Sequence, residues 1–320
     1  MRLWFIQITI TALLGFLAHH AVPVWNDSTE QFVLLFGFLS VGLFHGSADL
    51  LLIRKIRNIP SGKGAYGWGT LYLMVILLAA ALLWKVPQIL LGLFLFGSAF
   101  HFGESQMWKI PFGATRPQAL ARFVCYMLWG TWSMATPILL HPGESREILA
   151  SLGAFPFADR FFNHLLASPD SVLWFTNMLF SLALMSLFYL HFRKEKAISR
   201  GRFFRELVSL FVLQWVFQRT SVLISFGAYF VVWHSLSSLV DQIHCLEGEV
   251  GSRVLAYVRY AFPNWLISAG LVSILVLTDF SQGYGWSKLT LIFGAAILLT
   301  PPHLLVIHSL HSKKLRPVAY

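Results

Sequence analysis

The sequence predicts an all-α protein: a polytopic transmembrane helical bundle of about ten helices with both termini cytoplasmic. Three observations support this class, namely the composition, a series of apolar runs and the distribution of positive charge. Of the 320 residues, 57% are hydrophobic and only 12% are charged, whereas a soluble domain usually carries about 25% charged residues. No internal repeat or low-complexity linker divides the chain, so we expect one integral-membrane domain over residues 1–320.

Ten apolar runs are candidate spans, because a helix needs roughly 20 apolar residues to cross a bilayer. They cover residues 3–22, 31–53, 70–84, 88–108, 119–140, 171–192, 204–218, 221–243, 257–278 and 289–311. We interpret the first run as a span rather than a signal peptide, since no small-x-small cleavage site follows it. The run at 204–218 is the weakest, and a re-entrant segment stays open there, because it is short and contains Arg205, Glu206 and Gln214.

The orientation follows from the Lys and Arg residues in alternate gaps between the runs. With a cytoplasmic N-terminus, nineteen of them fall in inner segments and five in outer ones, as the positive-inside rule requires. The net charge of +10 therefore reports topology, and no basic patch with interleaved aromatics indicates nucleic acid as a partner. The longest outer segment, 141–170, is predicted to be a loop.

Four histidines lie deep in apolar runs: His45, His101, His234 and His303. An ionisable residue inside a span costs about 2.5–3.5 kcal/mol on insertion scales, although a hydrogen bond to a neighbouring helix can satisfy a single histidine. All four belong to helices that run from outside to inside. Counted to the charged residue at the end of each run, the offsets are nine for His45, eight for His101, seven for His234 and ten for His303. Their depths therefore differ by only about 5 Å. This arrangement predicts a metal site in the bundle core, where imidazoles suit iron, copper, zinc or nickel.

Two carboxylates accompany these histidines. Asp49 follows His45 by four residues and Glu104 follows His101 by three, so each pair shares a helix face. A metal-bound imidazole usually donates its second N–H to such a group, and we expect both carboxylates to support the ligands in this way. Ion pairing with the basic residue at the end of each helix is the open alternative.

Pro301 and Pro302 directly precede His303 and are predicted to break or kink the last helix. Such a kink would turn His303 inward, although an ordinary transmembrane proline kink is also consistent with the pattern. His308 and His311 lie at the inner interface and are minor ligand candidates.

Aromatic residues line the histidine helices. Phe44, Phe102, Tyr229 and Trp233 are the candidate substrate-binding residues, because aromatic walls suit a long flat polyene. Aromatic side chains also fill membrane bundles routinely, and the pattern alone favours this packing role.

Four motifs carry a family resemblance: Phe44-His45-Gly46-Ser47-Ala48-Asp49, Ala99-Phe100-His101-Phe102-Gly103-Glu104, Trp233-His234-Ser235-Leu236-Ser237-Ser238 and Pro301-Pro302-His303. In this order, over nearly the whole chain, they resemble the Brp/Blh family of bacterial and archaeal membrane β-carotene 15,15'-dioxygenases. The resemblance implies a catalytic domain that uses Fe(II) and O₂ to cleave the central double bond of β-carotene, giving two all-trans-retinal molecules for a rhodopsin.

By the same resemblance, His45, His101, His234 and His303 are the iron ligands and the catalytic residues, in a cytoplasmic membrane whose lipid holds the substrate. A relative that acts on another carotenoid would carry the same motifs.

Two other classes stay open. A bis-histidine haem protein would use the same residues in two pairs, but their near-equal depth favours one centre. A transporter would need a polar path through the membrane, whereas 31–44 and 88–97 are almost wholly apolar. The clustered histidine motifs of membrane di-iron desaturases are absent from the sequence.

Overall fold

The computed structural model describes residues 2–20, 27–59, 63–113, 115–193, 198–246, 249–278 and 288–315. Within these ranges the chain is helical and contains no strand, which confirms the all-α class. The long helices are α1 (Arg2–His20), α5 (Lys63–Lys85), α6 (Pro87–Met107), α7 (Arg116–Leu140), α10 (Pro169–Phe192), α11 (Arg200–Arg219), α14 (Val250–Leu277) and α16 (Lys288–Leu315). The shorter ones are α2 (Asp27–Gly37), α3 (Leu43–Gly46), α4 (Asp49–Arg57), α8 (Pro142–Leu149), α9 (Phe155–Leu166), α12 (Val222–Gly227) and α13 (Leu236–Ile243).

Among the described residues, the ten predicted runs are helical over nearly their whole length, and residues 21 and 22 of the first run lie outside the described residues. Seven helical segments among the described residues are long and apolar enough to cross a membrane: Leu3–His20, Ser28–Arg57, Gly67–Lys85, Arg116–Leu140, Pro169–Phe192, Val222–Ile243 and Leu289–Ser312. The other three runs lie in α6, α11 and α14, helices of 21, 20 and 28 residues. The orientation stays a prediction, and three of the basic residues that support it, Lys194, Lys196 and Arg316, lie outside the described residues.

The predicted outer loop at 141–170 is mostly helical, and no candidate span among the described residues lies between Leu140 and Pro169, so its place outside the membrane stays a prediction. It contains α8, a π-helical turn at Ala150–Ala154 and α9. Phe162 and Leu165 of α9 are buried together with Val172 of α10, so α9 presents apolar residues at helical spacing despite the acidic residues around it. Arg146 and Asp159 form an ion pair at 2.7 Å that joins α8 to α9.

The described chain divides into two compact units. Unit 1 comprises residues 1–34, 98–150 and 156–234, and unit 2 comprises residues 35–97, 151–155 and 235–320. Each unit draws on segments far apart in the sequence, so neither corresponds to one continuous stretch of chain. The single-domain expectation stays a prediction.

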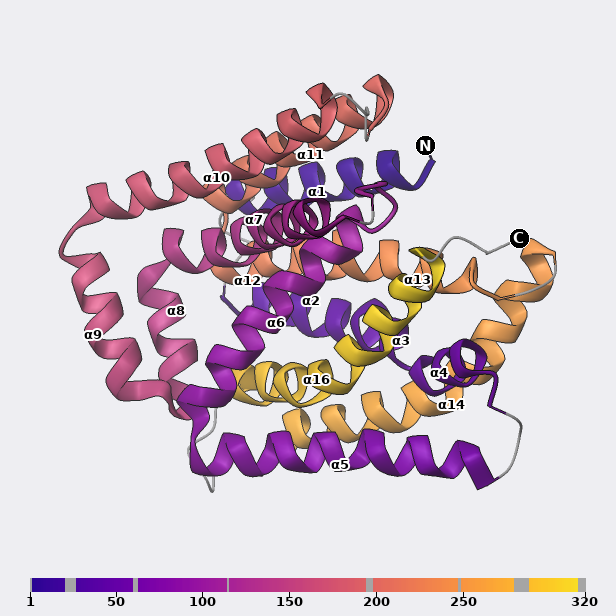
Figure 1. Ribbon diagram of the computed structural model, residues 1–320. Coiled ribbons are helices and arrows are strands. Elements are labelled where there is room, and N and C mark those ends of the chain that lie inside the picture. Colours follow the sequence, from indigo (N-terminus) through magenta and orange to yellow (C-terminus); the bar gives the residue numbers. More distant parts are fainter. Residues whose placement is uncertain are drawn as a thin grey trace. The chain divides into compact units, whose positions relative to one another are not determined.

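In unit 1, α7 packs against α10, and α11 packs against both α1 and α10 (Figure 1). The interior contains the fully buried rings of Trp129, Trp132 and Phe217. Trp132 Nε1 donates to Gln214 Oε1 at 2.9 Å. Gln214, one of the three polar residues that weakened the prediction of a span at 204–218, is therefore buried and hydrogen-bonded.

The C-terminal half of α6 lies very close to α7 at two glycines, Gly103 of α6 and Gly130 of α7. A Cβ atom placed on Gly103 would lie 1.9 Å from the backbone oxygen of Tyr126, and one placed on Gly130 would lie 1.6 Å from the backbone oxygen of Ala99. Only glycine permits such an approach. These contacts fix the part of α6 that carries His101.

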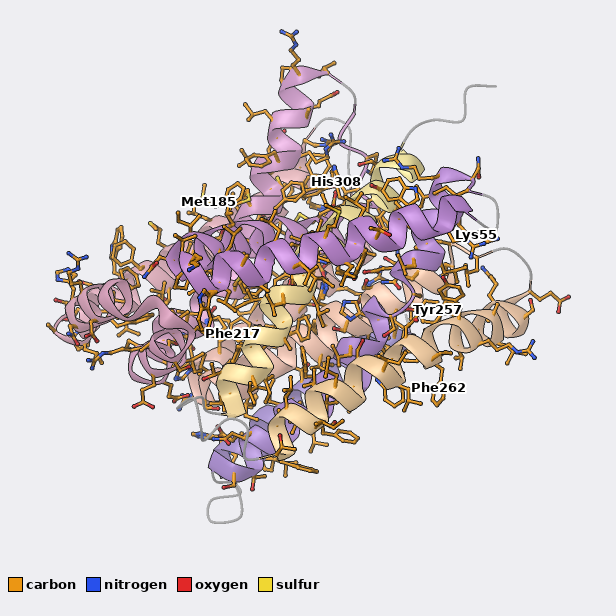
Figure 2. The ribbon with its side chains drawn as sticks, turned by 90° about the horizontal axis from the view of Figure 1, so that it is seen from below. Lys55, Met185, Phe217, Tyr257, Phe262 and His308 are labelled. Carbon is orange, nitrogen blue, oxygen red and sulfur yellow. The ribbon has the colours of Figure 1, made fainter. Side chains whose placement is uncertain are left out.

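In unit 2, α16 packs against α4, α5 and α14, and α14 also packs against α3. Large apolar side chains cover outer surfaces of the helices, as in a lipid-facing protein. Phe262 is one example: it is 48% exposed and lies on the outer side of α14 (Figure 2).

Two of the predicted spans are irregular helices. The span at 28–57 consists of α2, a π-helical turn at Phe38–Gly42, α3 and, after a break at residues 47–48, α4. The span at 222–243 consists of α12, a π-helical segment at Ala228–Ser235 and α13. Such π-helical turns are rare and occur frequently at functional sites. One lies just before His45 and the other contains His234.

The proline pair does not end the last helix. α16 continues through Pro301 and Pro302 to Leu315 and bends along its length (Figure 1), which is the behaviour expected of a proline kink. The predicted kink is therefore consistent with the structure, whereas a complete break is not.

Candidate metal centre

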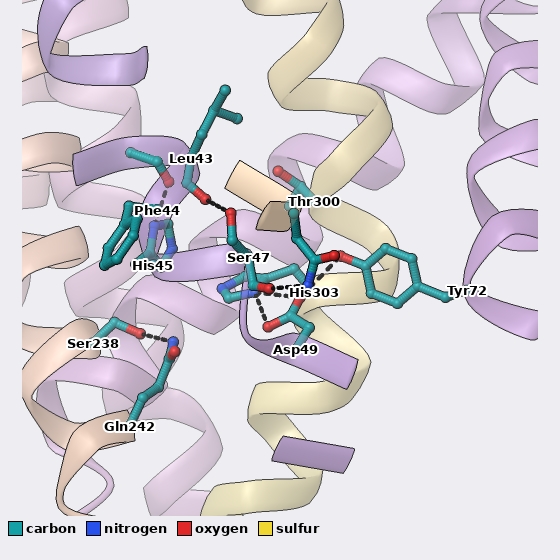
Figure 3. A network of polar contacts seen from close by, with 12 residues as sticks. Leu43, Phe44, His45, Ser47, Asp49, Tyr72, Ser238, Gln242, Thr300 and His303 are labelled. Atoms are coloured by element: carbon teal, nitrogen blue, oxygen red, sulfur yellow. Dashed lines mark hydrogen bonds and ion pairs between the residues drawn. The ribbon is translucent and has the colours of Figure 1, made fainter. Parts of the chain in front are cut away.

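Two of the four predicted histidines meet in unit 2. The rings of His45 on α3 and His303 on α16 are buried, and their centroids lie 4.8 Å apart with the ring planes at 86°. Nδ1 of His45 bonds to the carbonyl oxygen of Gly42, and Nδ1 of His303 lies 3.0 and 2.9 Å from the two carboxylate oxygens of Asp49 (Figure 3).

These acceptors determine the tautomer of both rings. A carbonyl or carboxylate oxygen can only accept, so Nδ1 carries the proton in each ring and the lone pair of the neutral imidazole lies on Nε2. Metal-binding histidines are usually oriented by this kind of bond at the second nitrogen. The pair therefore has the donor chemistry of a metal ligand set.

Asp49 supports a different histidine from the one predicted. The expectation assumed one continuous helix in which Asp49 lies one turn after His45, but α3 ends at Gly46 and α4 begins at Asp49. The break between the two helices changes the direction in which the carboxylate points. The carboxylate accepts hydrogen bonds from Nδ1 of His303 and from the hydroxyl of Tyr72. The predicted pairing of Asp49 with His45 is therefore wrong, and support of a metal ligand by Asp49 stays a prediction, with His303 as the partner.

Three side chains of α14 bind the irregular segment that carries His45. Trp265 Nε1 donates to the carbonyl of Leu39 at 2.6 Å and Asn264 Nδ2 to that of Ser47 at 3.1 Å. Tyr257 donates to the carbonyl of His45 at 3.1 Å. A π-helical turn and a helix break disturb the regular backbone hydrogen bonds, and these donors satisfy carbonyl groups in that region.

Sequence reasoning missed this role of α14. Asn264 is a polar residue within an apolar run, which is the signal that would have drawn attention to it. Tyr257 gives no such signal, because its hydroxyl partners are far away in the sequence. It also approaches Gln242 Oε1 at 2.7 Å, and Gln242 donates to Ser238 at 3.0 Å (Figure 3).

The other two histidines meet in unit 1. The rings of His101 on α6 and His234 in the π-helical segment are buried, with centroids 4.8 Å apart and ring planes at 71°. Gln7 of α1 donates to the carbonyls of Val232 and Trp233 at 2.9 and 3.1 Å. These bonds join α1 to the π-helical segment that carries His234, just as the donors of α14 join that helix to the segment that carries His45.

The four predicted substrate-binding residues have different surroundings. Phe102 lies 4.7 Å from His234 and 5.2 Å from Tyr229, measured between ring centroids. Phe44 packs instead against Tyr257 and Trp265 of α14, and Trp233 donates from Nε1 to Thr11 at 2.8 Å. Phe102 and Tyr229 therefore form an aromatic wall beside a histidine, whereas Phe44 and Trp233 support the helices that carry histidines.

Glu104 is buried one turn after His101 on α6, so the shared helix face is preserved there. His311 is buried on α16, while His308 is exposed beside Ser312.

The residues fit a metal ion. All four histidines are buried, and the neutral imidazole is the commonest metal ligand among side chains. Neutral imidazoles with their second nitrogen bonded to oxygen suit iron, copper or zinc.

Residues 36–311 match the family model described as Beta-carotene 15,15'-dioxygenase. No curated protein and no solved structure matches the chain. The match covers most of the chain and includes all four histidines.

Proposed function

Since the chain belongs to the β-carotene 15,15'-dioxygenase family, we propose that it cleaves the central 15,15' double bond of β-carotene with O₂ and releases two molecules of all-trans-retinal. The carbon–carbon double bond and the O–O bond both break, and each carbon receives one oxygen atom as an aldehyde. Atoms balance without any added proton or external reductant. A cytoplasmic membrane of a bacterium or archaeon is the proposed location, with a rhodopsin as the consumer of the retinal.

The observation that carries the proposal is the pairing of buried histidines within each unit, at 4.8 Å between ring centroids in both. We propose that His45, His101, His234 and His303 together hold one Fe(II) ion. Iron supplies the redox chemistry that lets O₂ react with a closed-shell polyene. The two oxygen-bonded Nδ1 atoms in unit 2 keep the Nε2 lone pairs in place for the metal.

The role of the protein beyond ligation is to bind and position the polyene. Phe102 and Tyr229 are proposed to lie along the bound carotenoid, because their rings pack on each other and the Phe102 ring also packs against His234. Correct placement of the central bond accounts for the cleavage position, since a 1 Å error in register costs about 100-fold in rate. Buried apolar walls also keep water away from the reacting carbons.

The test is expression in cells that make β-carotene, followed by extraction of the pigments and metal analysis of the purified protein. The wild-type chain is expected to yield retinal and to retain about one iron per chain. Each of the four histidine-to-alanine variants should lose both properties. His164→Ala is the matched control, because His164 is exposed on α9.

The outcomes separate the competing classes. Retinal formation by His45→Ala would contradict the ligand assignment. A strong Soret band in the purified protein would identify a haem protein instead. Cleavage of another carotenoid in preference to β-carotene would retain the chemistry and change the substrate.

A further inference from the structure

Asp49 connects the histidine His303 to a residue of a third helix. Its side chain is 2% exposed, and its Oδ2 atom accepts two bonds. One comes from Nδ1 of His303 and one from the hydroxyl of Tyr72, each at 2.9 Å. Figure 3 shows Tyr72 and His303 on either side of this carboxylate.

The three residues come from helices that pack together in unit 2. Tyr72 belongs to α5, Asp49 to α4 and His303 to α16, and α16 contacts both other helices. One turn beyond Asp49 and His303, the apolar residues of α4 and α16 form a buried cluster against which the ring of Tyr72 packs: Leu52, Ile53, Val306, Ile307 and Leu310. The ring is therefore held by packing, and its hydroxyl is directed to the carboxylate.

A buried carboxylate requires donors, because an unpaired charge in an apolar interior is costly. The carboxylate can also rotate about the Cβ–Cγ bond, since the distribution of this terminal torsion angle in Asp is broad. The bond from Tyr72 to Oδ2 restricts this rotation and keeps the carboxylate in the plane that accepts the Nδ1–H of His303.

We propose that Tyr72 is a positioning residue that acts through Asp49 to fix the orientation and tautomer of His303. This inference rests on the proposed function, in which His303 is an iron ligand. Tyr72 has no contact with the reacting atoms in this scheme. Its effect on the metal arises from the direction in which the Nε2 lone pair of His303 points.

The decisive variant is Tyr72→Phe, which removes the hydroxyl and keeps the ring in its packing site, so the fold should persist. Tyr189→Phe is the matched control, because Tyr189 is on the exposed surface of α10. Asp49→Asn tests the intermediate residue without a change of shape. All proteins are purified as full chains and loaded with Fe(II) or with Co(II) as a spectroscopic probe.

Removal of bonds to metal-ligating histidines typically costs 10–100-fold in metal affinity. We expect Asp49→Asn to release iron to a chelator about tenfold faster or more than the wild type, and Tyr72→Phe to release it several-fold faster. The visible bands of the Co(II) protein should shift in both variants and stay unchanged in Tyr189→Phe. The rate of retinal formation at saturating β-carotene should fall in Tyr72→Phe with little change in KM.

Two results would overturn the inference while leaving the proposed function intact. One is a Tyr72→Phe protein whose iron release and Co(II) spectrum equal those of the wild type. The other is a loss of thermal stability alone, which would make the Tyr72 bond purely structural. If the wild-type chain itself holds no iron, the proposed function fails instead, so the two failures are distinguishable.

Discussion

Replacement of Gly130 by alanine is expected to force α6 and α7 apart. The new Cβ would lie 1.6 Å from the backbone oxygen of Ala99, whereas ordinary contacts begin at 3.4 Å, so about 1.8 Å of room is missing. The obstacle is backbone, which cannot rotate away as a side chain does. Ala99 is two residues before His101 on α6, so a shift of this contact also moves the histidine.

The magnitude follows from this overlap. Inserting one methyl group into a packed interior typically costs about 1–3 kcal/mol, and the upper part of this range applies here because backbone must move. At about 2–4 °C per kcal/mol for a chain of moderate size, the melting temperature should fall by about 5–10 °C. Retinal formation should fall further, since a 1 Å misplacement of a reacting group costs about 100-fold.

The assay compares Gly130→Ala with Gly92→Ala in detergent, by thermal unfolding and by retinal formation. Gly92 is a glycine of α6, the helix that Gly130 of α7 approaches, and a Cβ at Gly92 meets nothing within 4 Å. This control should be as stable as the wild type or slightly more stable. If the two variants have the same melting temperature and the same activity, the reasoning about close helix approach is wrong.

Three further predictions concern pairing, metal and topology. Gln214→Leu leaves the buried indole N–H of Trp132 without its acceptor and should lower stability by about 1–3 kcal/mol, measured by thermal unfolding against the wild type. Removal of the metal with a chelator should lower the melting temperature, and Fe(II) should restore it, since a ligand at 100 times its Kd contributes about 2.7 kcal/mol. With both termini cytoplasmic, a cysteine at Asp170 should react with an impermeant maleimide in intact cells and one at Arg57 should not; the reverse labelling would contradict the orientation.

The local properties of the chain were predictable from sequence. Within the part of the chain that the structure describes, the ten apolar runs are mostly helical, because a chain in lipid must satisfy its backbone hydrogen bonds internally. The four deep histidines are buried, because nothing in an apolar run would offset the cost of exposing them to lipid. The helices within the outer segment 141–170 were not predicted, although Phe162 and Leu165 of α9 have helical spacing.

Irregular helices limited what could be inferred about the site. The pairing of Asp49 with His45 assumed 3.6 residues per turn throughout, and a break at residues 47–48 invalidates that assumption. The two π-helical segments next to the histidines share no sequence signature, although Gly42 ends the first and Gly227 precedes the second. The donors from α14 and the hydroxyl of Tyr72 come from distant parts of the chain, where spacing carries no information about contact.

By itself, the sequence determined the helical membrane class and the identity of the buried histidines, because hydropathy and the cost of burying an imidazole depend on local composition. Tertiary structure decided which histidine Asp49 supports and which helices hold the segment of His45. Both features depend on hydrogen bonds between groups far apart in the sequence, which tertiary packing brings to about 3 Å from each other. Asp49 is the clearest case, since its distance from His45 in sequence suggested one partner and the helix break gave it another, 254 residues away.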